Sequence, residues 1–253
     1  MNFIIHKTVA ERYAKHRPFF HPLVIEKIKA YLNIQIPVNF ALDVGCGPGQ
    51  STVALKEIAD LVVGADISVE MLNLAEKSSG IQYIQAAAEK LAIKRNFSDL
   101  LTTSLAYHWF DYKRFLPEAW RVLKDNGWLI IYNNAFYGQM KENSSFEQWV
   151  GQSYGQHYPT PPRNSAPLTW ELANEFGFDS FHSEEYQNEV QFTMEELCAY
   201  LTTHSNVIAT VEQGSEKIEE VYLWLVSQTK PFFSSEKATF AFGGYIWYLQ
   251  KSP

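Results

Sequence analysis

The sequence predicts an α/β fold in which helices cover both faces of a mostly parallel sheet. Three observations support this prediction. Between residues 38 and 133, short apolar runs typical of strands alternate with segments of helical periodicity five times. A glycine-rich run ends the first of these strands, and hydrophobic residues make up 46% of the 253-residue chain, enough to bury a core between sheet and helices.

The first half of the chain supports the fold element by element. Residues 8–32 form two predicted helices broken around Pro18 and Pro22, because proline disrupts a helix interior. Five strands follow, and we expect them at residues 39–45, 61–68, 81–91 (running into a loop), 98–110 and 128–134. Helices are expected between them at residues 51–59, 68–78 and 111–124, with a turn at 125–127.

The pattern changes after residue 133. Residues 135–169 are rich in Gly, Pro, Ser, Asn and aromatic residues, which predicts an irregular lid or helical insertion. A helix over 169–178 is expected to end at Gly177. Two late strands, 181–193 and 238–250, flank helical stretches between residues 194 and 228.

Charge and cysteine content restrict the function classes. The net charge of -7 lacks the cationic surface that sequence-independent nucleic-acid binding needs, so we expect no nucleic-acid substrate. Cys46 and Cys198 are expected to be reduced thiols, since two cysteines cannot form a disulfide framework. No signal-peptide pattern and no apolar run long enough to span a membrane is seen, which predicts a soluble cytoplasmic protein. No His/Cys/Asp cluster has metal-ligand spacing, so no metal is expected.

Residues 45–49 form a glycine-rich loop after the first predicted strand. Gly45, Gly47 and Gly49 lie where ligands bind in open parallel sheets, outside the carboxyl ends of the strands. Glycine allows a sharp turn and a close approach of the main chain to a ligand. We therefore expect a nucleotide-like ligand, the alternative being a tight turn without one.

The residues around this loop restrict the chemical class of the ligand. The stretch "GCGPGQST" lacks the lysine of a phosphate-binding P-loop, and Gln50 stands where a dinucleotide fingerprint requires glycine. Asp43 would repel a pyrophosphate and suits a ligand without phosphate or with positive charge. Asp66 ends the second strand, where a carboxylate can accept both hydroxyls of a ribose; a solvated acid is the alternative.

At this point the sequence resembles the class I S-adenosylmethionine-dependent methyltransferases, of the methyltransferase domain 11 type. The resemblance covers residues 39–133, with "LDVGCGPG", "VVGADIS", "AAAEKL", "SDLLTTSLAYHWFD" and "EAWRVLKDNGWLIIY" in order. The segment "ERYAKHRPFFHP" further resembles small-molecule methyltransferases of the trans-aconitate methyltransferase type, although Phe20 and His21 depart from the usual pattern. The cofactor implied is S-adenosylmethionine.

The resemblance also implies an architecture. It is a Rossmann-like seven-stranded, mostly parallel sheet with helices on both faces, an antiparallel last strand, an N-terminal helical lid and an insertion after the fifth strand. We expect a single domain over 1–253, made of a lid (1–37), a cofactor-binding core (38–133), an acceptor-side insertion (134–190) and C-terminal helices and strand (191–253).

The cofactor roles are carried over residue by residue. The glycine loop would face the methionine moiety and the ribose, Asp43 would lie near the amino group, and Asp66 would hold the ribose hydroxyls. The remaining implied cofactor contacts are Cys46 in the loop, Ile67 on the adenine, Ala87, Ala88 and Glu89 around the adenine, and Ser104 under the methionine end. Many relatives carry an acid where Ala87 stands, so adenine recognition would rest on backbone groups or Glu89.

Candidate residues for the methyl acceptor are less specific. His108 is the one strong candidate base of the core motifs, because its free pKa is near neutrality; a structural histidine is the alternative. Arg17 could grip a carboxylate of the cofactor or acceptor, and Arg163 is a second candidate. The further candidates are Tyr13 and Phe19 of the lid, Trp109 after the fourth strand, and Tyr137, Trp149, Tyr154 and His157 of the insertion.

These residues predict an enzyme that methylates a small organic molecule. O-methylation of a carboxylate or hydroxyl is the first hypothesis, and C-methylation of a lipid or quinone precursor is the second. A catalytically silent S-adenosylmethionine-binding partner protein and a nicotinamide-dependent oxidoreductase are alternatives of other classes, of which Gln50 and Asp43 disfavour the latter. The acceptor and the oligomeric state are not predicted.

Overall fold

The computed structural model describes residues 7–161 and 168–253. The described chain divides into two compact units, which we describe separately. Unit 1 contains residues 7–18, 134–161 and 186–244, and unit 2 contains residues 19–133, 168–185 and 245–253. The division passes through the segment expected as an N-terminal lid, since residues 7–18 and 19–37 belong to different units.

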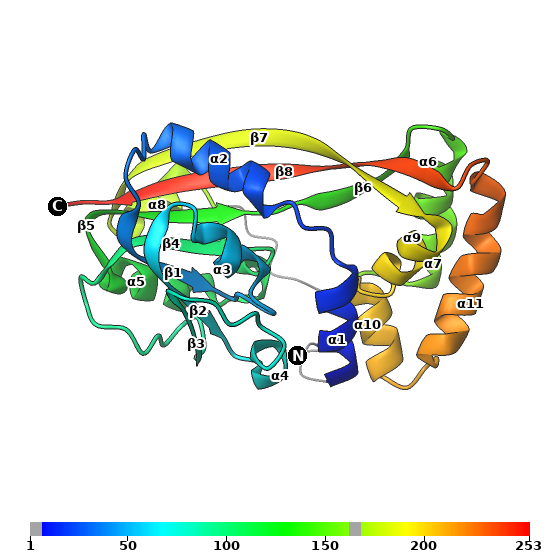
Figure 1. Cartoon of the computed structure of the whole chain (residues 1–253), viewed down its shortest axis with the longest axis horizontal. Helices are drawn as coiled ribbons and strands as arrows, with labels where there is room; N and C mark the ends of the chain where they lie inside the picture. Colours follow the sequence, from blue (N-terminus) through cyan, green and yellow to red (C-terminus); the bar gives the residue numbers. More distant parts are fainter. Residues whose placement is uncertain (1–6, 162–167) are drawn as a thin grey trace. The chain divides into compact units, whose positions relative to one another are not determined.

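Unit 2 is built on a parallel sheet with the strand order β3-β2-β1-β4-β5 (Figure 1). Its strands are β1 (Val38–Val44), β2 (Ala59–Asp66), β3 (Ile81–Gln85), β4 (Ser98–Ser104) and β5 (Leu123–Tyr132). The chain runs outward from β1 to β3 and then returns to β4 on the other side of β1. The carboxyl ends of β1 and β4 thus flank a topological switch point, where such sheets bind ligands.

Helices cover both faces of this sheet. The helices of unit 2 are α2 (His21–Tyr31), α3 (Gln50–Leu55), α4 (Val69–Leu72), the 3₁₀ turn η2 (Tyr107–Trp109), α5 (Tyr112–Val122) and α8 (Trp170–Glu175). Leu42 and Val44 of β1 pack in one core with Phe115 of α5, whereas Asp43 between them bonds to Thr52 of α3. Because successive strand residues face opposite ways, α3 and α5 cover opposite faces.

The sheet has eight strands, one more than expected. The additional strand is β6 (Ala135–Met140), which lies in the segment expected to be irregular. The late strands are longer than the apolar pattern indicated, at β7 (Phe178–Thr193) and β8 (Lys237–Lys251). As expected for the last strand, β8 is antiparallel to its neighbours: it pairs with β5 and with β6, and β7 pairs with it in turn.

Unit 1 is mostly helical around an aromatic core. Its helices are α1 (Lys7–His16), α6 (Ser145–Trp149), the π-helical η3 (Val150–Tyr154), α7 (Gly155–His157), α9 (Met194–Leu201), α10 (Ser205–Glu212), α11 (Ile218–Thr229) and the 3₁₀ turn η4 (Lys230–Phe232). Phe146, Tyr158, Tyr200, Phe240 and Phe242 are buried together. Many of the aromatic residues of this chain therefore serve packing.

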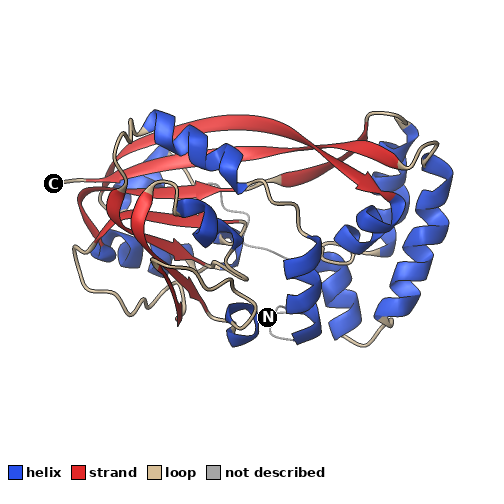
Figure 2. Ribbon diagram, viewed as in Figure 1, coloured by secondary structure: helices blue, strands red, loops and turns tan. Residues whose placement is uncertain are grey.

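Several local predictions need correction (Figure 2). The predicted helices 51–59 and 68–78 are only α3 and α4, of six and four residues. The predicted turn 125–127 lies inside β5, where Asn126 has a φ of +62°. Pro22 lies in the first turn of α2 rather than breaking it, because a proline there removes no helical hydrogen bond. Within residues 7–161 and 168–253, no helix is both long and apolar enough to cross a bilayer.

Candidate functional site

The glycine loop joins β1 to α3 and needs glycine at all three positions. Gly45, Gly47 and Gly49 have φ values of +70°, +54° and +84°, in the left-handed region that favours glycine. A Cβ on Gly45 would meet Ala106 at 2.6 Å. A Cβ on Gly47 would meet no heavy atom within 4 Å, so bare backbone faces open space at that residue.

Asp66 at the end of β2 is bonded to this loop. Its Oδ2 accepts a hydrogen bond from the Gly47 N–H at 2.8 Å, and its Oδ1 accepts one from the Ser68 N–H at 2.8 Å. Burial raises the pKa of Asp66, and these two backbone N–H groups oppose the rise. A carboxylate offers about four lone pairs, so each oxygen of this half-buried group keeps acceptor capacity for a hydroxyl.

Asp43 lies at the centre of a ring of hydroxyls. Its carboxylate is fully buried and accepts hydrogen bonds from Ser51 at 2.6 Å, Thr52 at 2.7 Å and Thr102 at 2.9 Å. Burial raises the pKa of Asp43, and the three hydroxyls oppose this rise. Asp43 therefore ties β1 to α3 and β4, which is a different task from the contact with an amino group that the resemblance implied.

The sequence reasoning missed these three hydroxyls. Ser51 and Thr52 follow the loop directly, and both side chains turn back to Asp43. Thr102 lies in β4, where it pairs with Asp43 in the sheet register. The sequence does contain a signal for this hydroxyl ring: two hydroxyl residues directly follow the loop, and a third lies near the end of a neighbouring strand.

The other predicted cofactor residues lie along the same edge of unit 2. Cys46 is buried within the loop, and its burial raises the pKa of its thiol well above the usual value. Ile67 is 55% exposed, an apolar surface next to Asp66. Ala87 and Ala88 follow β3, and a short bridge joins Ala87 to Lys90.

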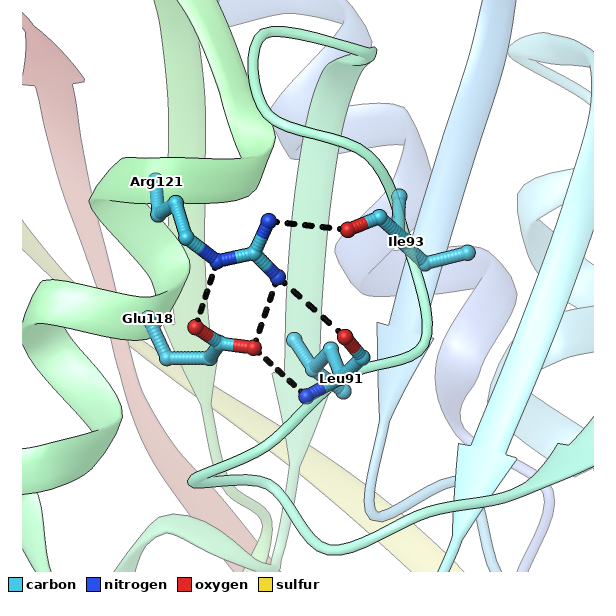
Figure 3. A network of polar contacts seen from close by, with 4 residues as sticks. All are labelled: Leu91, Ile93, Glu118 and Arg121. Atoms are coloured by element: carbon cyan, nitrogen blue, oxygen red, sulfur yellow. Dashed lines mark hydrogen bonds and ion pairs between the residues drawn. The ribbon is translucent and has the colours of Figure 1, made fainter.

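The segment after β3 is held in place by α5 (Figure 3). Arg121 grips the Glu118 carboxylate with Nε and Nη2 at 2.7 and 2.8 Å, and its Nη1 donates to the Ile93 carbonyl at 2.9 Å. Glu118 accepts in turn from the Leu91 N–H at 2.6 Å. Glu89 itself accepts a hydrogen bond from the Asp111 N–H at 2.9 Å, which joins this segment to the start of α5.

The end of β4 supplies the residues expected near the methyl group. The Ser104 hydroxyl is buried and makes no hydrogen bond to any described residue. Leu105 has a φ of +54°, a strained backbone conformation for this residue type. His108 and Trp109 follow in η2 with their rings 4.9 Å apart; His108 is half-buried and Trp109 is 37% exposed.

The predicted acceptor residues fall in both units. In unit 1, the Arg17 guanidinium lies 4.7 Å from the Tyr13 ring and donates to the Thr203 carbonyl at 2.8 Å. Tyr137 of β6, also in unit 1, is 40% exposed, whereas Phe19 belongs to unit 2 and is 54% exposed. Arg163 lies outside the described residues.

The insertion residues Trp149 and Tyr154 are mainly core residues of unit 1. Both are buried in its aromatic cluster, and the Tyr154 hydroxyl lies 3.0 Å from His204 Nδ1. His157 stacks on Trp224 with ring centroids 4.3 Å apart. These contacts give each of the three a packing role.

The residues of unit 2 fit an adenosyl cofactor without phosphate. Gly47 offers backbone beside open space, Asp66 keeps acceptor capacity for ribose hydroxyls, and Ser104 holds a buried hydroxyl without a partner among the described residues. In the described chain, no hydrogen bond joins a Lys or Arg side chain to the glycine loop. Within the described ranges, no three His, Cys, Asp or Glu side chains lie close enough together to hold a metal ion.

Comparison with known proteins agrees with this geometry. Residues 42–131 match the model of a methyltransferase domain family. A protein of Dictyostelium discoideum classed as a methyltransferase is 32% identical over 62% of this chain and 60% of its own length. The malonyl-[acyl-carrier protein] O-methyltransferase of Buchnera aphidicola is 26% identical over 53% of each chain.

Among solved structures, a protein of Anaeromyxobacter dehalogenans assigned to the type II methyltransferases shares the fold. It superimposes with a TM-score of 0.70 at 20% identity, covering 94% of this chain and 99% of its own. The chain spans only about half to three-fifths of the length of the curated relatives named above.

Fold and site together define an α/β domain with a glycine loop after β1 that is bonded to an acid at the end of β2. Residues 42–131 are similar to a methyltransferase domain family, and the fold of the chain is similar to that of a solved methyltransferase.

Proposed function

We propose that this protein transfers a methyl group from S-adenosylmethionine to a small organic acceptor by O-methylation, most simply of a carboxylate. The observation that carries the proposal is the pairing of the Gly47 backbone with Asp66, beside open space at Gly47. When bound, S-adenosylmethionine supplies a methyl group on a positively charged sulfur. The chain's own residues have to orient both reactants and exclude water, and such orientation can contribute roughly 7–11 kcal/mol.

Within this proposal, each residue of unit 2 has a defined task. Asp66 accepts the ribose hydroxyls, and its bond to Gly47 fixes the loop to the sugar site. Ile67 packs on the adenine, and Ala87, Ala88 and Glu89 line its edge. Asp43 and its hydroxyl shell keep β1, α3 and β4 in register, while the Ser104 hydroxyl faces the methionine end.

The choice of O-methylation rests on two supports. Several relatives are named malonyl-[acyl-carrier protein] O-methyltransferases, including the Buchnera aphidicola protein. Methylation of a carboxylate needs no general base, because the nucleophile is already ionised at neutral pH. His108 is then required only for a hydroxyl or carbon acceptor. Arg17 stays a proposed carboxylate ligand, since its guanidinium is already held beside Tyr13.

Cofactor binding tests the proposed class of enzyme, and methyl transfer to an acceptor tests the proposed reaction. We expect S-adenosylmethionine and S-adenosylhomocysteine, but not NAD, to raise the unfolding temperature; saturation at 100 times Kd stabilises by about 2.7 kcal/mol. Absence of any shift with either compound would refute the proposal. With methyl-labelled cofactor, we expect label to enter small carboxylic acids as base-labile esters and to be absent from their amides.

Other outcomes of the same assay support the alternatives. Label transferred only to quinone or lipid precursors, in a base-stable form, would favour C-methylation. Binding without turnover on every class of acceptor would favour a silent cofactor-binding subunit. Cytoplasmic localisation also stays a prediction.

A further inference from the structure

Tyr83 is a residue of β3 whose side chain reaches the glycine loop. Tyr83 pairs with Gly64 of β2 in the sheet register, and its ring lies over that glycine. A Cβ added to Gly64 would stand 2.7 Å from Tyr83 Cδ1 and 2.8 Å from Cε1. The backbone of Gly64 is ordinary strand, so its missing side chain provides room for this ring.

The far end of the same ring reaches Gly49, where the loop becomes α3. A Cβ on Gly49 would collide with the Tyr83 hydroxyl, and would lie 2.9 Å from Cζ and 3.0 Å from Cε1. The Gly49 carbonyl accepts the first hydrogen bond of α3, from the Val53 N–H at 2.9 Å. The ring therefore occupies the space between the neighbouring strand and the last residue of the loop.

Ring packing is the main part of this contact. The Tyr83 hydroxyl oxygen is buried and lies close to Thr52, without a hydrogen bond of ordinary geometry. Burial also raises the pKa of the phenol, so it stays neutral. Cys46 Sγ also lies beside Gly64, 2.9 Å from the position of an added Cβ. The first half of the loop therefore packs against Gly64 as well.

The loop is also held by polar contacts to β2 and within itself. The Ala65 carbonyl accepts from the Gly45 and Cys46 N–H groups at 2.7 and 3.2 Å. Asp66 accepts from Gly47, and the Gly49 N–H donates to the Cys46 carbonyl at 3.0 Å. Tyr83 adds a contact from β3 that packs directly against Gly49.

We propose that the Tyr83 ring is a positioning residue for the cofactor: it supports the glycine loop and thereby sets its affinity for S-adenosylmethionine. This inference rests on the proposed function, because it requires the cofactor to bind at that loop. A shorter side chain would let Gly49 and the start of α3 settle toward β3. The Gly47–Asp66 bond and the ribose acceptors would then be displaced.

The test compares three variants by calorimetric titration with S-adenosylmethionine, with thermal unfolding as a second readout. We expect Tyr83→Phe, which keeps the ring, to bind within about threefold of the parent, and Tyr83→Leu to bind at least about tenfold more weakly, a loss of about 1.4 kcal/mol. Tyr31→Leu is the matched control, since this tyrosine of unit 2 stacks on His182 with ring centroids 4.7 Å apart and packs against Trp128. It should unfold at lower temperature but bind like the parent.

Two results would overturn the proposal: parent-like binding by Tyr83→Leu, or equal weakening by Tyr83→Phe and Tyr83→Leu, which would assign the effect to the hydroxyl. If Tyr83→Leu does not fold, Gly64→Ala tests the contact from the other side. Its methyl would push the ring toward the loop and should weaken binding at least about tenfold; unchanged binding would contradict us. If the parent itself does not bind S-adenosylmethionine, the proposed function fails rather than this inference.

Discussion

At the scale of single residues, the acids Asp43 and Asp66, near the carboxyl ends of the neighbouring strands β1 and β2, have different surroundings. Asp43 is fully buried and accepts three hydroxyl hydrogen bonds, whereas Asp66 is only partly buried and accepts two backbone hydrogen bonds. The sequence assigned both to the cofactor from their distance to the glycines. We propose Asp66 as the direct ligand, because Asp43 is enclosed by hydroxyls that spacing along the chain does not reveal.

Replacement of Asp66 by alanine tests this assignment. Two charge-assisted hydrogen bonds at roughly 1.5–3 kcal/mol each would be lost, so Kd for S-adenosylmethionine should rise about 100-fold or more in titration calorimetry. His108→Ala is the comparison and should leave the affinity mostly intact. Parent-like affinity in Asp66→Ala would mean that the ribose binds elsewhere.

His21 makes the stability of unit 2 sensitive to acid. It is buried, with Nδ1 3.1 Å from the Tyr132 hydroxyl, and burial lowers its pKa from 6.5 to about 3. The unfolded chain therefore binds this proton at a higher pH than the folded protein does. The stabilising contribution is complete above pH 6.5 and is lost as the pH falls toward 3.

His21→Asn keeps a polar group near Tyr132 but does not titrate. Between pH 7.5 and 5.0, urea denaturation of the parent should show about 2 kcal/mol more loss of unfolding free energy than the variant, at 1.36 kcal/mol per pH unit below 6.5. Identical pH profiles for the two proteins would show that His21 is accessible to protons when folded.

At the scale of elements, the glycine loop is the part whose conformation carries function. Gly47 and Gly214 form a matched pair, because both have positive φ and neither has a heavy atom within 4 Å of an added Cβ. Gly214 lies between α10 and α11 in unit 1. The two positions differ in their relation to the proposed cofactor site.

Each Gly→Ala substitution should lower the unfolding free energy by about 1–2 kcal/mol, because alanine is strained in the left-handed region. Only Gly47→Ala should also weaken S-adenosylmethionine binding, since its methyl would occupy the open space at the loop. Equal binding by both variants, measured in one titration series, would remove Gly47 from the site.

The last strand is anchored in unit 2 by a buried lysine. Lys251 of β8 donates to Asn96 Oδ1 at 2.7 Å and the Leu123 carbonyl at 2.8 Å, and lies 4.0 Å from the Trp120 ring centroid. Lys251→Met should lower the unfolding free energy by about 2 kcal/mol, from a lost charged hydrogen bond and cation–π contact. Lys237→Met, on an exposed position of the same strand, should change it by less than about 0.5 kcal/mol. Chemical denaturation measures both changes. Equal small changes for the two variants would show that Lys251 does not anchor the strand.

At the scale of the whole molecule, net charge makes a further prediction. With a formal charge of -7, the protein should show no salt-dependent retention on immobilised single- or double-stranded nucleic acid. Retention at low salt that weakens steeply with added salt would reveal a local basic surface. The same assay in the presence of S-adenosylmethionine excludes a surface formed only with cofactor bound.

The alternation of strands and helices was predictable because each element carries its own periodicity. The loop, its three glycines and Asp66 followed from local spacing, and the parallel sheet with an antiparallel last strand is confirmed. The lengths of α3 and α4 and the presence of β6 were not predicted. Short helices are set by packing rather than propensity, and β6 is defined by its pairing with β8, which lies about a hundred residues away.

The sequence by itself determined that the chain forms a glycine loop after its first strand and places an acid at the tip of the second. Backbone freedom at glycine and the period of each strand are local properties. Only the tertiary structure decided which acid is enclosed by hydroxyls and which stays partly exposed. Thr102 reaches Asp43 from 59 residues away, and Tyr83 reaches Gly49 from another strand. Such contacts arise from how strands are ordered in the sheet, and spacing along the chain does not contain that order.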